Sequence, residues 1–529
     1  MTRASKPGTT RRLRRALGAA AGVVVLGAGT VLAVSAGTIP TSAALSPGTP
    51  PAVDVPVGQT VGVCPGPAQL LQSTPVQGDP QFSPASKTAT NRLTAAVIGE
   101  ASGAMPASSL AGVNGSLLQK VSDGQNAPAA PPASRPAAIA SRSTNGPALL
   151  NASALEGRPA SSAALYQYSA TDGDLRGVAA ASCASPANDL WFTGASTLVG
   201  RTSVMYLTNA STTPATVNLD FYGDQAIPQA PAGSRSIQIP PGTTKSFVLG
   251  GFVPSQRNLS VHVRSSGGPV SGVIQQSTLR GLTPGGVDFL TPVASPGTRQ
   301  VVTAVELQEP VAARNLAAGS GFEDASAALQ VTVPGAADAV VQVRVFGPSG
   351  PVTLPAGAVF TAKAGTVTEI PLAGLPAGKY SVAASSDVSF AASVRSVKGL
   401  KSSDPLDFAI SGAQGRLGDG HVVPVGDGAT PTLVFGVPDG HAKISAVPIT
   451  ADGAFHAPVA LDVAGGTTAT LAVPDKVDGA KPVAYSVSAS GDPAYGAVLL
   501  EAAQGNGIAV ASILPAAGGR QSVAVTLGY

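Results

Sequence analysis

The segments VNLDFYG (Val217–Gly223) and VQVRVFG (Val341–Gly347) share one pattern, in which apolar residues alternate with polar ones. In the first segment Val217, Leu219 and Phe221 are separated by Asn and Asp. A period of two places successive side chains on opposite faces of a strand. Each segment is therefore predicted to be a strand with one face toward a core and the other toward water.

Other segments recur around these strands in the same order. IPPGTTKSFVL, AKAGTVTEIPL and VAGGTTATLAV each place a Gly-Thr turn before a Thr/Val strand, with Gly242, Gly365 and Gly466 in register. YSVAASSDVSFAASV begins at Tyr380, and the similar YSVSASGDPAYGAVL begins at Tyr485. A repeat of about 100–120 residues with several short strands is typical of tandem β-sandwiches. We predict an all-β fold of tandem immunoglobulin-like β-sandwich modules, arranged as beads on a string.

The repeat sets the expected domain boundaries. Between the stalk and the repeats lies a less regular region, with strand candidates at Ala163–Ala170 and Leu175–Cys183 and a short helix expected at Leu110–Val121. The expected parts are a cytoplasmic basic flank at 1–15, a transmembrane helix or signal peptide at 16–39, a Pro/Ser/Thr stalk at 40–60, an irregular β region at 61–187 with a low-complexity loop at 126–147, and β-sandwiches at 188–308, 309–426 and 427–529.

The N-terminus has the charge pattern of a membrane segment. Residues 16–39 carry no charge, and as a helix rising 1.5 Å per residue they reach about 36 Å, enough for the hydrocarbon core of a bilayer. The six cations before them, all within residues 1–15, are expected to stay in the cytoplasm. This predicts a single-pass membrane protein with its C-terminal bulk outside the cytoplasm. A cleaved signal peptide, which would make the protein secreted, remains the alternative.

The net charge of +3 hides an uneven distribution. Because six cations lie in the first fifteen residues, the remainder of the chain carries a net charge of −3. Nucleic-acid binding needs a concentrated basic face that displaces counterions, and the body of this chain has none. We therefore expect no nucleic-acid partner.

Both cysteines, Cys64 and Cys183, fall in the part expected to be exported. An even count in an oxidising compartment predicts one disulfide between them. The alternative, a reactive thiol pair, lacks a CxxC spacing or an adjacent histidine.

The sequence holds few groups that carry chemistry. None of the motifs of serine hydrolases, zinc proteases, phosphate-binding loops or dinucleotide-binding folds occurs. His421, His441 and His456 lie in the last repeat and offer a possible zinc site, but two of them follow Asp-Gly pairs that are typical of hairpin turns. We expect no catalytic residue, no cofactor and no metal.

Two further features carry competing interpretations. Glu306, Glu309, Glu323 and Asp324 form an acidic neighbourhood that suits either carboxylate chemistry or a solvated loop. Trp191, in DLWFTG, is a weak candidate for binding a sugar ring, although a lone indole in a β-domain is more often a core residue.

The order CASPANDLWFTG (Cys183–Gly194), GRTSVMYLTNASTTPATVNLDFYG (Gly200–Gly223) and IPPGTTKSFVL resembles a family of uncharacterised secreted or membrane-anchored actinobacterial proteins. The family is a domain of unknown function found near glycosyltransferase genes. The resemblance implies export, β-sandwich modules and a role in envelope glycan biology. It carries over no active site.

The sequence thus favours a non-catalytic, membrane-anchored protein of the cell envelope that presents a binding or scaffolding surface. Its expected partners are envelope proteins or cell-wall glycan, with the membrane contacted through the N-terminal helix. The alternatives are a carbohydrate-binding accessory of an envelope glycosylation system and, third, a hydrolase that uses the acidic or histidine groups.

Overall fold

The computed structural model describes residues 52–54, 58–71, 85–126, 136–227, 229–515 and 522–524. The basic flank at 1–15 and the membrane segment at 16–39 lie outside these residues. Among the residues that are described, no helix has the length and apolar character needed to cross a membrane. β1 (Ala52–Asp54) and β34 (Ser522–Ala524) pair antiparallel in a small unit of their own. Residues 57–520 form the second unit, which contains all the other described strands.

The fold is nearly all-β, as the alternating pattern predicts. In β12, Val217, Leu219 and Phe221 are buried and the residues between them are partly exposed, and β20 shows the same alternation. The turn glycines Gly242 and Gly365 have φ of 64° and 69°, a conformation that residues with a Cβ rarely adopt. The period-two strands and Gly-Thr turns therefore form as the sequence indicates.

Four modules of eight strands follow one another along the chain. In the first module β2-β7-β4-β5 form one sheet and β6-β3-β8-β9 the other. Its strands are β2 (Thr60–Cys64), β3 (Thr90–Ile98), β4 (Met105–Gly112), β5 (Leu117–Gln125), β6 (Ala137–Arg142), β7 (Ala148–Ala152), β8 (Ser161–Ala170) and β9 (Gly177–Ser182).

The second module repeats this order, with sheets β10-β15-β12-β13 and β14-β11-β16-β17. A 3-10 turn, η2 (Leu249–Gly251), follows its fifth strand. The strands are β10 (Asp189–Ala195), β11 (Arg201–Asn209), β12 (Ala215–Tyr222), β13 (Ile237–Ile239), β14 (Thr243–Val248), β15 (Leu259–Gly267), β16 (Ser271–Arg280) and β17 (Thr283–Leu290).

In the third module the two sheets share one long strand, β24 (Gly378–Lys398). Its first half pairs with β18 and β20, and its second half pairs with β19 and β25. The other elements are β18 (Gly297–Leu307), α2 (Pro310–Ala317), β19 (Ala328–Thr332), β20 (Ala339–Gly347), β21 (Gly350–Val352), β22 (Val359–Ala362), β23 (Val367–Pro371) and β25 (Asp407–Gly412). Although β18 was expected in the unit ending at residue 308, its pairing places it in this module.

The fourth module returns to two separate sheets, β26-β31-β28-β29 and β30-β27-β32-β33. Its first strand precedes residue 427, the expected start of the last repeat. The strands are β26 (His421–Pro424), β27 (Thr430–Val437), β28 (His441–Thr450), β29 (Val459–Ala464), β30 (Thr467–Ala472), β31 (Pro482–Gly491), β32 (Tyr495–Glu501) and β33 (Ile508–Ser512).

The prediction of a short helix at Leu110–Val121 is wrong. These residues end β4, make a turn and begin β5, with Ala111 opposite Leu117. The turn contains Asn114 and Gly115, whose φ is 83°. Of the two residues only Gly115 takes a positive φ, as a glycine in a short hairpin loop does, and Oδ1 of Asn114 accepts the N–H of Ser116 at 3.1 Å. The local turn chemistry therefore outweighs the helical spacing of the leucines.

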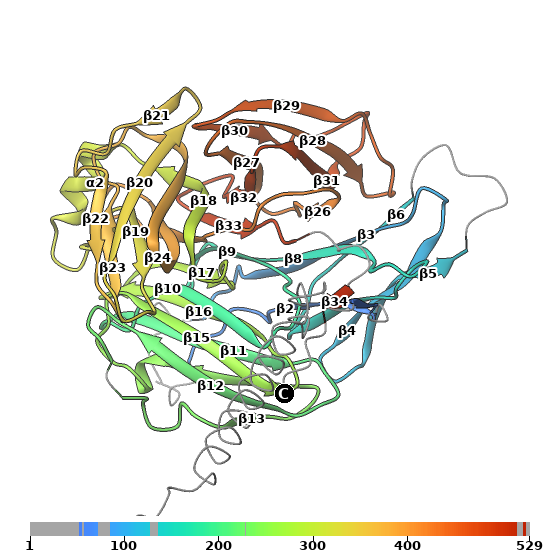
Figure 1. Cartoon of the computed structure of the whole chain (residues 1–529), viewed down its shortest axis with the longest axis horizontal. Helices are drawn as coiled ribbons and strands as arrows, with labels where there is room; N and C mark the ends of the chain where they lie inside the picture. The colour runs from blue at the N-terminus through green and yellow to red at the C-terminus, as the bar shows by residue number, and fades with distance from the viewer. Residues whose placement is uncertain are drawn as a thin grey trace, which may run out of the picture. The chain divides into compact units, whose positions relative to one another are not determined.

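The modules do not form beads on a string. Their last strands β9, β17, β25 and β33 pack one against the next in a closed circuit, and Figure 1 shows β9, β17 and β33 in the middle of this unit with the modules around them. The hydrophobic cores also cross module boundaries. Phe408 and Ile410 of β25 pack into the core of the second module, and Val287 and Phe289 of β17 into that of the first.

Candidate binding site

A disulfide joins the two sheets of the first module. Cys64 ends β2 and Cys183 follows β9, and both are buried with their Cα atoms 4.3 Å apart. The backbone N–H of Val63 also donates to the carbonyl of Ala184 at 2.9 Å. The predicted Cys64–Cys183 bridge is thus confirmed, and it fixes the start of the module to its end.

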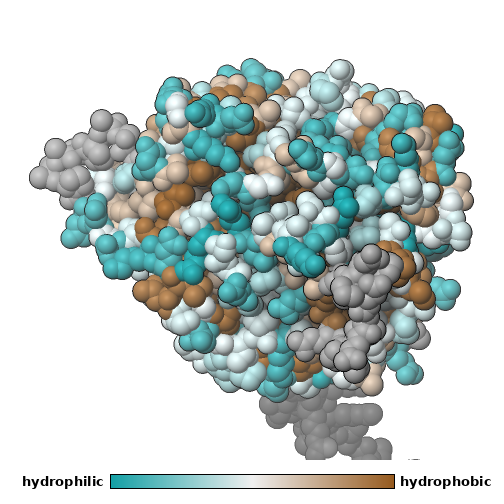
Figure 2. All heavy atoms as spheres, turned by 180° about the vertical axis from the view of Figure 1, so that it is seen from behind, coloured by the Kyte–Doolittle hydropathy of each residue, from teal (hydrophilic) through white to brown (hydrophobic). Residues whose placement is uncertain are grey.

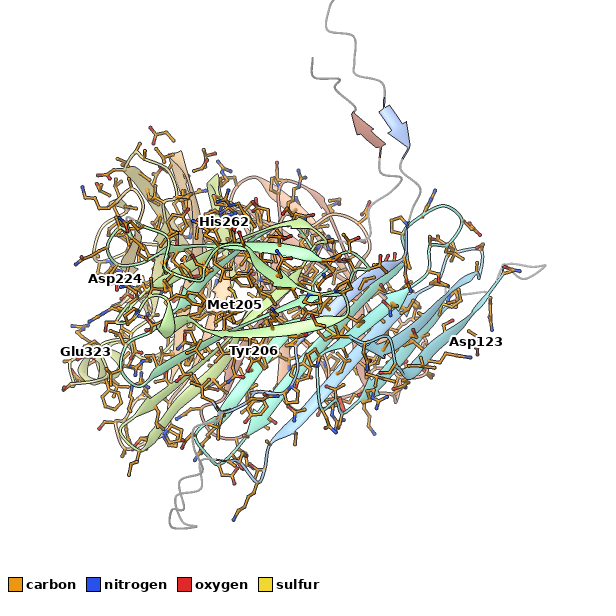
Figure 3. The ribbon with its side chains drawn as sticks, turned by 90° about the horizontal axis from the view of Figure 1, so that it is seen from below. Asp123, Met205, Tyr206, Asp224, His262 and Glu323 are labelled. Carbon is orange, nitrogen blue, oxygen red and sulfur yellow. A yellow bond between two sulfur atoms is a disulfide. The ribbon has the colours of Figure 1, made fainter. Side chains whose placement is uncertain are left out.

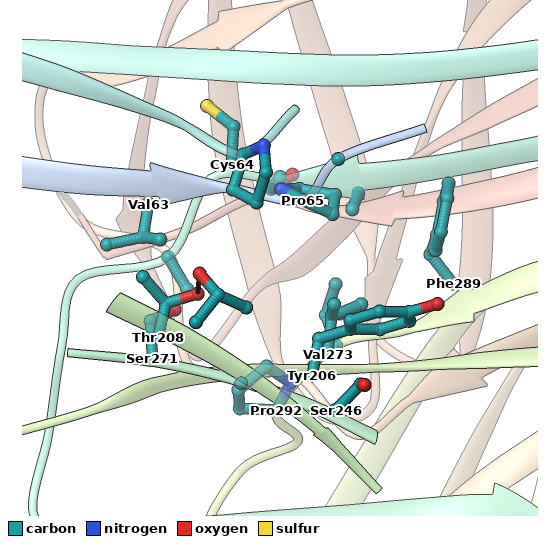
Figure 4. Close-up of a pocket in the computed structure, with 18 of the residues that line it drawn as sticks. Val63, Cys64, Pro65, Tyr206, Thr208, Ser246, Ser271, Val273, Phe289 and Pro292 are labelled. Carbon is teal, nitrogen blue, oxygen red and sulfur yellow. Dashed lines mark hydrogen bonds between the residues drawn. The ribbon is translucent and has the colours of Figure 1, made fainter. Parts of the chain in front are cut away.

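A cavity of about 200 Å³ lies beside this disulfide, between the first and second modules. Figure 4 shows Cys64 and Pro65 on one side of it and Tyr206, Thr208 and Ser246 on the other. The first wall is the Cys-Pro-Gly-Pro segment that follows β2. The second is the outer surface of the sheet that contains β14, β11 and β16.

An amide pair holds the two walls together. The N–H of Gln69 donates to Oε1 of Gln275 at 2.8 Å, and Nε2 of Gln275 donates back to the carbonyl of Gln69 at 2.8 Å. Gln275 lies on β16 and is buried. Because Pro65 and Pro67 have no N–H to give to a sheet, the segment leaves β2 and depends on this side chain for its position.

Among the described residues that line the cavity none is charged, and hydroxyl-bearing side chains alternate with prolines and small apolar residues. Oγ1 of Thr208 and Oγ1 of Thr244 share a hydrogen bond of 2.8 Å, and Ser246 and Ser271 lie close by. Burial raises the pKa of Tyr206, so its phenol stays neutral at physiological pH and can donate a hydrogen bond. Such a lining can bind an uncharged polar ligand, but it offers no acid–base pair for catalysis.

Trp191 does not lie in this cavity. Its indole is buried and stacks on the ring of His262, with centroids 4.0 Å apart, and lies 5.5 Å from the ring of Tyr222. Nε2 of His262 is 2.9 Å from Oδ2 of Asp189, which holds the imidazole over the indole. The faces of the indole are thus occupied by the protein's own side chains.

The three histidines of the last repeat have separate partners. Nε2 of His421 accepts the N–H of Gly418 at 2.8 Å, and its Nδ1 donates to the carbonyl of Leu514 at 2.8 Å. His441 pairs with Asp462, and His456 lies 2.7 Å from Asp478. In the described part of the chain no three His, Cys, Asp or Glu side chains are grouped as metal ligands would be.

The acidic neighbourhood is also dispersed. Glu309 caps α2 by accepting the N–H of Ala312 at 2.8 Å, whereas Asp324 pairs with two arginines. Glu306 lies 3.7 Å from Lys398. Figure 3 shows Glu323 at the periphery of the view, away from Tyr206 near its middle.

Sequence reasoning missed two buried carboxyl groups on the central strands. Asp288 of β17 accepts the N–H of Ile410 at 2.7 Å, and Asp407 of β25 accepts N–H groups from three other strands. Burial raises the pKa of Asp288 to about 8 and raises that of Asp407 well above its ordinary range. The only sequence signal is an aspartate inside an apolar run, in VDFL and in LDFAI.

Comparison with known proteins gives a family but no activity. None of the curated proteins matches the chain. Residues 138–474, which include the whole of the second and third modules, match the model of a family described only as of unknown function. The match spans more than half of the chain, which therefore belongs to this family, DUF5719.

Proposed function

We propose that the protein is an exported, membrane-anchored and non-catalytic component of the cell envelope. In this proposal the four-module unit is a rigid platform outside the cytoplasm, and the cavity beside the disulfide binds a neutral glycan. The observation that carries the proposal is the lining between Pro65 and Tyr206, in which the described residues are uncharged and combine hydroxyl groups with apolar surface.

Two observations support the location. Disulfides persist in oxidising compartments and are rare in the cytosol, and Cys64–Cys183 is buried and closes a separation of 119 residues. The cationic flank before residues 16–39 is the arrangement that retains an N-terminus in the cytoplasm. Membrane fractionation with protease protection tests this: the modules should be digested from the outer side, and a cytosolic protein would contradict the proposal.

The chemistry of the cavity favours a sugar over a charged ligand. Thr208, Thr244 and Ser246 offer hydroxyl groups that both donate and accept, while Tyr206 offers an aromatic ring and a neutral phenol. A charged ligand entering a cavity without a counter-charge would pay desolvation without compensation. A neutral saccharide has hydroxyl groups for the polar wall and C–H groups for the ring and the prolines.

Calorimetric titration with neutral and with acidic oligosaccharides of equal length tests the ligand class. We expect binding of a neutral series only, weakened at least tenfold in Tyr206→Ala and in Thr244→Val. Ser403→Ala, in an exposed loop, is the matched control and should bind as the wild type does. Equal binding by all four proteins, or no binding of any neutral glycan, would remove the cavity from the proposal, and release of new reducing ends would contradict the non-catalytic role.

A scaffolding role is the second candidate. Val199 and Leu282 are 97% and 80% exposed, and they lie in neighbouring turns, since the N–H of Leu279 donates to the carbonyl of Gly200. In Figure 2, which shows the molecule from behind the view of Figure 1, apolar residues occur in small groups between hydrophilic ones. Crosslinking through a cysteine placed at Leu282 tests this role; capture of an envelope protein in place of any glycan would favour it.

We also propose that each module is related to the immunoglobulin-like sandwich. In both arrangements the second strand pairs with the fifth and the third with the sixth. The outer strands of the sheets differ. Here the first strand pairs with the sixth and the seventh with the second, whereas in the immunoglobulin arrangement the first pairs with the second and the seventh with the sixth. A solved structure that superimposes the four central strands on an immunoglobulin domain, with exchanged flanks, would support the relation.

A further inference from the structure

A cluster of buried arginines lies where the second module meets the third. It consists of Arg201 and Arg280 from the second module, Arg395 from β24, and the carboxylates Asp324 and Glu369 (the arginine cluster). The three arginine side chains are each only 9% exposed. Buried arginines are rare unless they are paired, so their partners need to be counted.

Asp324 neutralises only part of the charge. It lies 2.8 Å from Arg201 and 2.6 Å from Arg280, and Arg395 lies 3.2 Å from Glu369. Burial raises the pKa of Asp324, but the neighbouring arginines lower it by more, so this carboxylate is ionised. Three buried guanidinium groups therefore face two carboxylates, and Arg257, an exposed residue, also lines the space beside them.

Two of the buried donors have no hydrogen-bond partner among the described residues. Nε of Arg280 donates to the carbonyl of Gly321 and its Nη2 to Asp324, but Nη1 has no acceptor. Arg395 donates through Nη1 and Nη2, and its Nε is unpaired. A buried charged donor without an acceptor carries its full desolvation penalty, which is a reason to expect a ligand.

One buried acceptor in the same place is unpaired as well. Gln330 of β19 donates through Nε2 to Oδ1 of Asn258 at 2.7 Å, and no described residue donates to its Oε1. The unpaired set is thus two cationic donors and one neutral acceptor. A halide or sulfate satisfies donors only, whereas hydrogen phosphate has oxygens that accept and one O–H that donates.

These residues line a cavity of about 30 Å³, enough for about two waters or one small anion. Glycines keep it open. A Cβ on Gly285 would lie 2.1 Å from Nη1 of Arg280, and one on Gly194, whose φ is 95°, would lie 2.5 Å from Ile410. The missing side chains of Gly285 in β17 and Gly194 in β10 thus leave room for the guanidinium group of Arg280 and for the side chain of Ile410 at the edge of the cavity.

We propose that this cavity is a binding site for inorganic phosphate in its hydrogen-phosphate form, held by Arg280 and Arg395 and oriented by Gln330. The bound anion supplies acceptors for the two unpaired arginine donors and offsets the excess positive charge between the second and third modules. This site is separate from the cavity beside the disulfide, so its success or failure says nothing about glycan binding.

Anomalous diffraction from crystals soaked in arsenate, and separately in selenate, tests the proposal on the full chain. Arsenate carries an O–H as phosphate does, whereas selenate, like sulfate, does not. We expect an arsenate peak within hydrogen-bonding distance of Nη1 of Arg280 and at least fivefold lower occupancy for selenate. Water-sized density without an anomalous peak, or equal occupancy of the two anions, would overturn the proposal.

Calorimetry with phosphate gives a second measurement that does not depend on crystals. Arg280→Lys and Arg395→Lys keep the charge but lose the fork of donors, so phosphate affinity should fall at least tenfold in each. Arg264→Lys, whose side chain is 54% exposed and pairs with Asp220, is the matched control and should bind as the wild type does. Unchanged affinity in both cluster variants would contradict the assignment.

Discussion

The buried carboxyl group of Asp407 accepts a hydrogen bond from the backbone N–H of Val178 at 2.8 Å, across 229 positions of sequence. Its Oδ2 also accepts from Ile508 at 3.0 Å, and its Oδ1 from Val287 at 3.2 Å and from Phe408 at 3.0 Å. The four donors lie on β9, β33, β17 and β25. One buried side chain therefore contacts the last strand of every module.

Replacing Asp407 by Asn tests how much these hydrogen bonds contribute to the free energy of unfolding. The amide has the same shape but only one acceptor oxygen, and its NH₂ group faces backbone donors. At least one buried N–H is then left unpaired, at a cost of about 1–3 kcal/mol for each. We expect Asp407→Asn to lose about 2–5 kcal/mol of unfolding free energy in guanidinium titrations.

Asp404→Asn, three residues earlier in a loop, is the control and should stay within about 0.5 kcal/mol of the wild type. If Asp407→Asn were as stable as this control, the hydrogen bonds at the centre would contribute nothing to holding the modules together.

The pKa of Asp288 predicts a stability that falls as pH rises. Burial raises its pKa from 3.8 to about 8 in the folded protein. Below pH 4 the carboxyl is protonated in both states; between pH 4 and 8 only the unfolded chain releases the proton, which favours unfolding. Wild type should lose about 1.4 kcal/mol per pH unit over this range relative to Asp288→Asn.

Unfolding free energies at several pH values between 5 and 9 measure this difference. The two curves should converge toward acid pH, separate through neutrality and run parallel above pH 8. Parallel curves throughout would mean that Asp288 is ionised in the folded protein at every pH tested. Asp404→Asn again serves as the comparison and should track the wild type.

The Cys64–Cys183 bridge should contribute strongly to the free energy of unfolding because it joins residues 119 positions apart. Constraining so long a loop in the unfolded chain is worth about 2–5 kcal/mol. We expect the double variant Cys64→Ser/Cys183→Ser to lose this amount and to unfold identically with and without reductant. Neutral-glycan affinity should fall too, since Cys64 and Pro65 form one wall of the cavity. Equal stability of oxidised and reduced wild type would contradict the prediction.

The alternation of β12 and β20 could be predicted from sequence because each strand has one face in a core and the other in water. The first module was harder to recognise for the opposite reason. In β3 the six residues from Leu93 to Ile98 are all buried, because Ala96 and Ile98 face Val422 and Ile449 of the fourth module. A strand covered on both faces has no period of two to read.

The closed circuit of modules and the cavity were not predictable from the sequence either. Asp407 binds backbone N–H groups, which every non-proline residue has, so no pairing of residue types reveals its partners. The cavity is lined by serines and threonines, among the commonest surface residues of a β-protein. The disulfide was predictable because only two cysteines are present and both fall in the part expected to be exported.

The fluorescence of Trp191 tests whether the rings of Trp191, His262 and Tyr222 in the second module are buried. It is the chain's single tryptophan and only 5% exposed, between His262 and Tyr222. Its fluorescence should be blue-shifted and poorly quenched by acrylamide, and neutral oligosaccharides should leave its emission unchanged, since Tyr206 and not Trp191 lines the cavity.

Removing the indole should destabilise the module, because Trp→Ala at a buried site costs about 3–5 kcal/mol. His262→Ala opens one face of the ring, so it should shift the emission to the red and cost less. Trp191→Phe, which retains an aromatic ring, is the conservative control and should restore most of the stability lost in Trp191→Ala. A stacked, covered indole has no free face for a sugar ring. A sugar-induced emission change that Tyr206→Ala leaves intact would therefore contradict the buried stack and make Trp191 the binding platform.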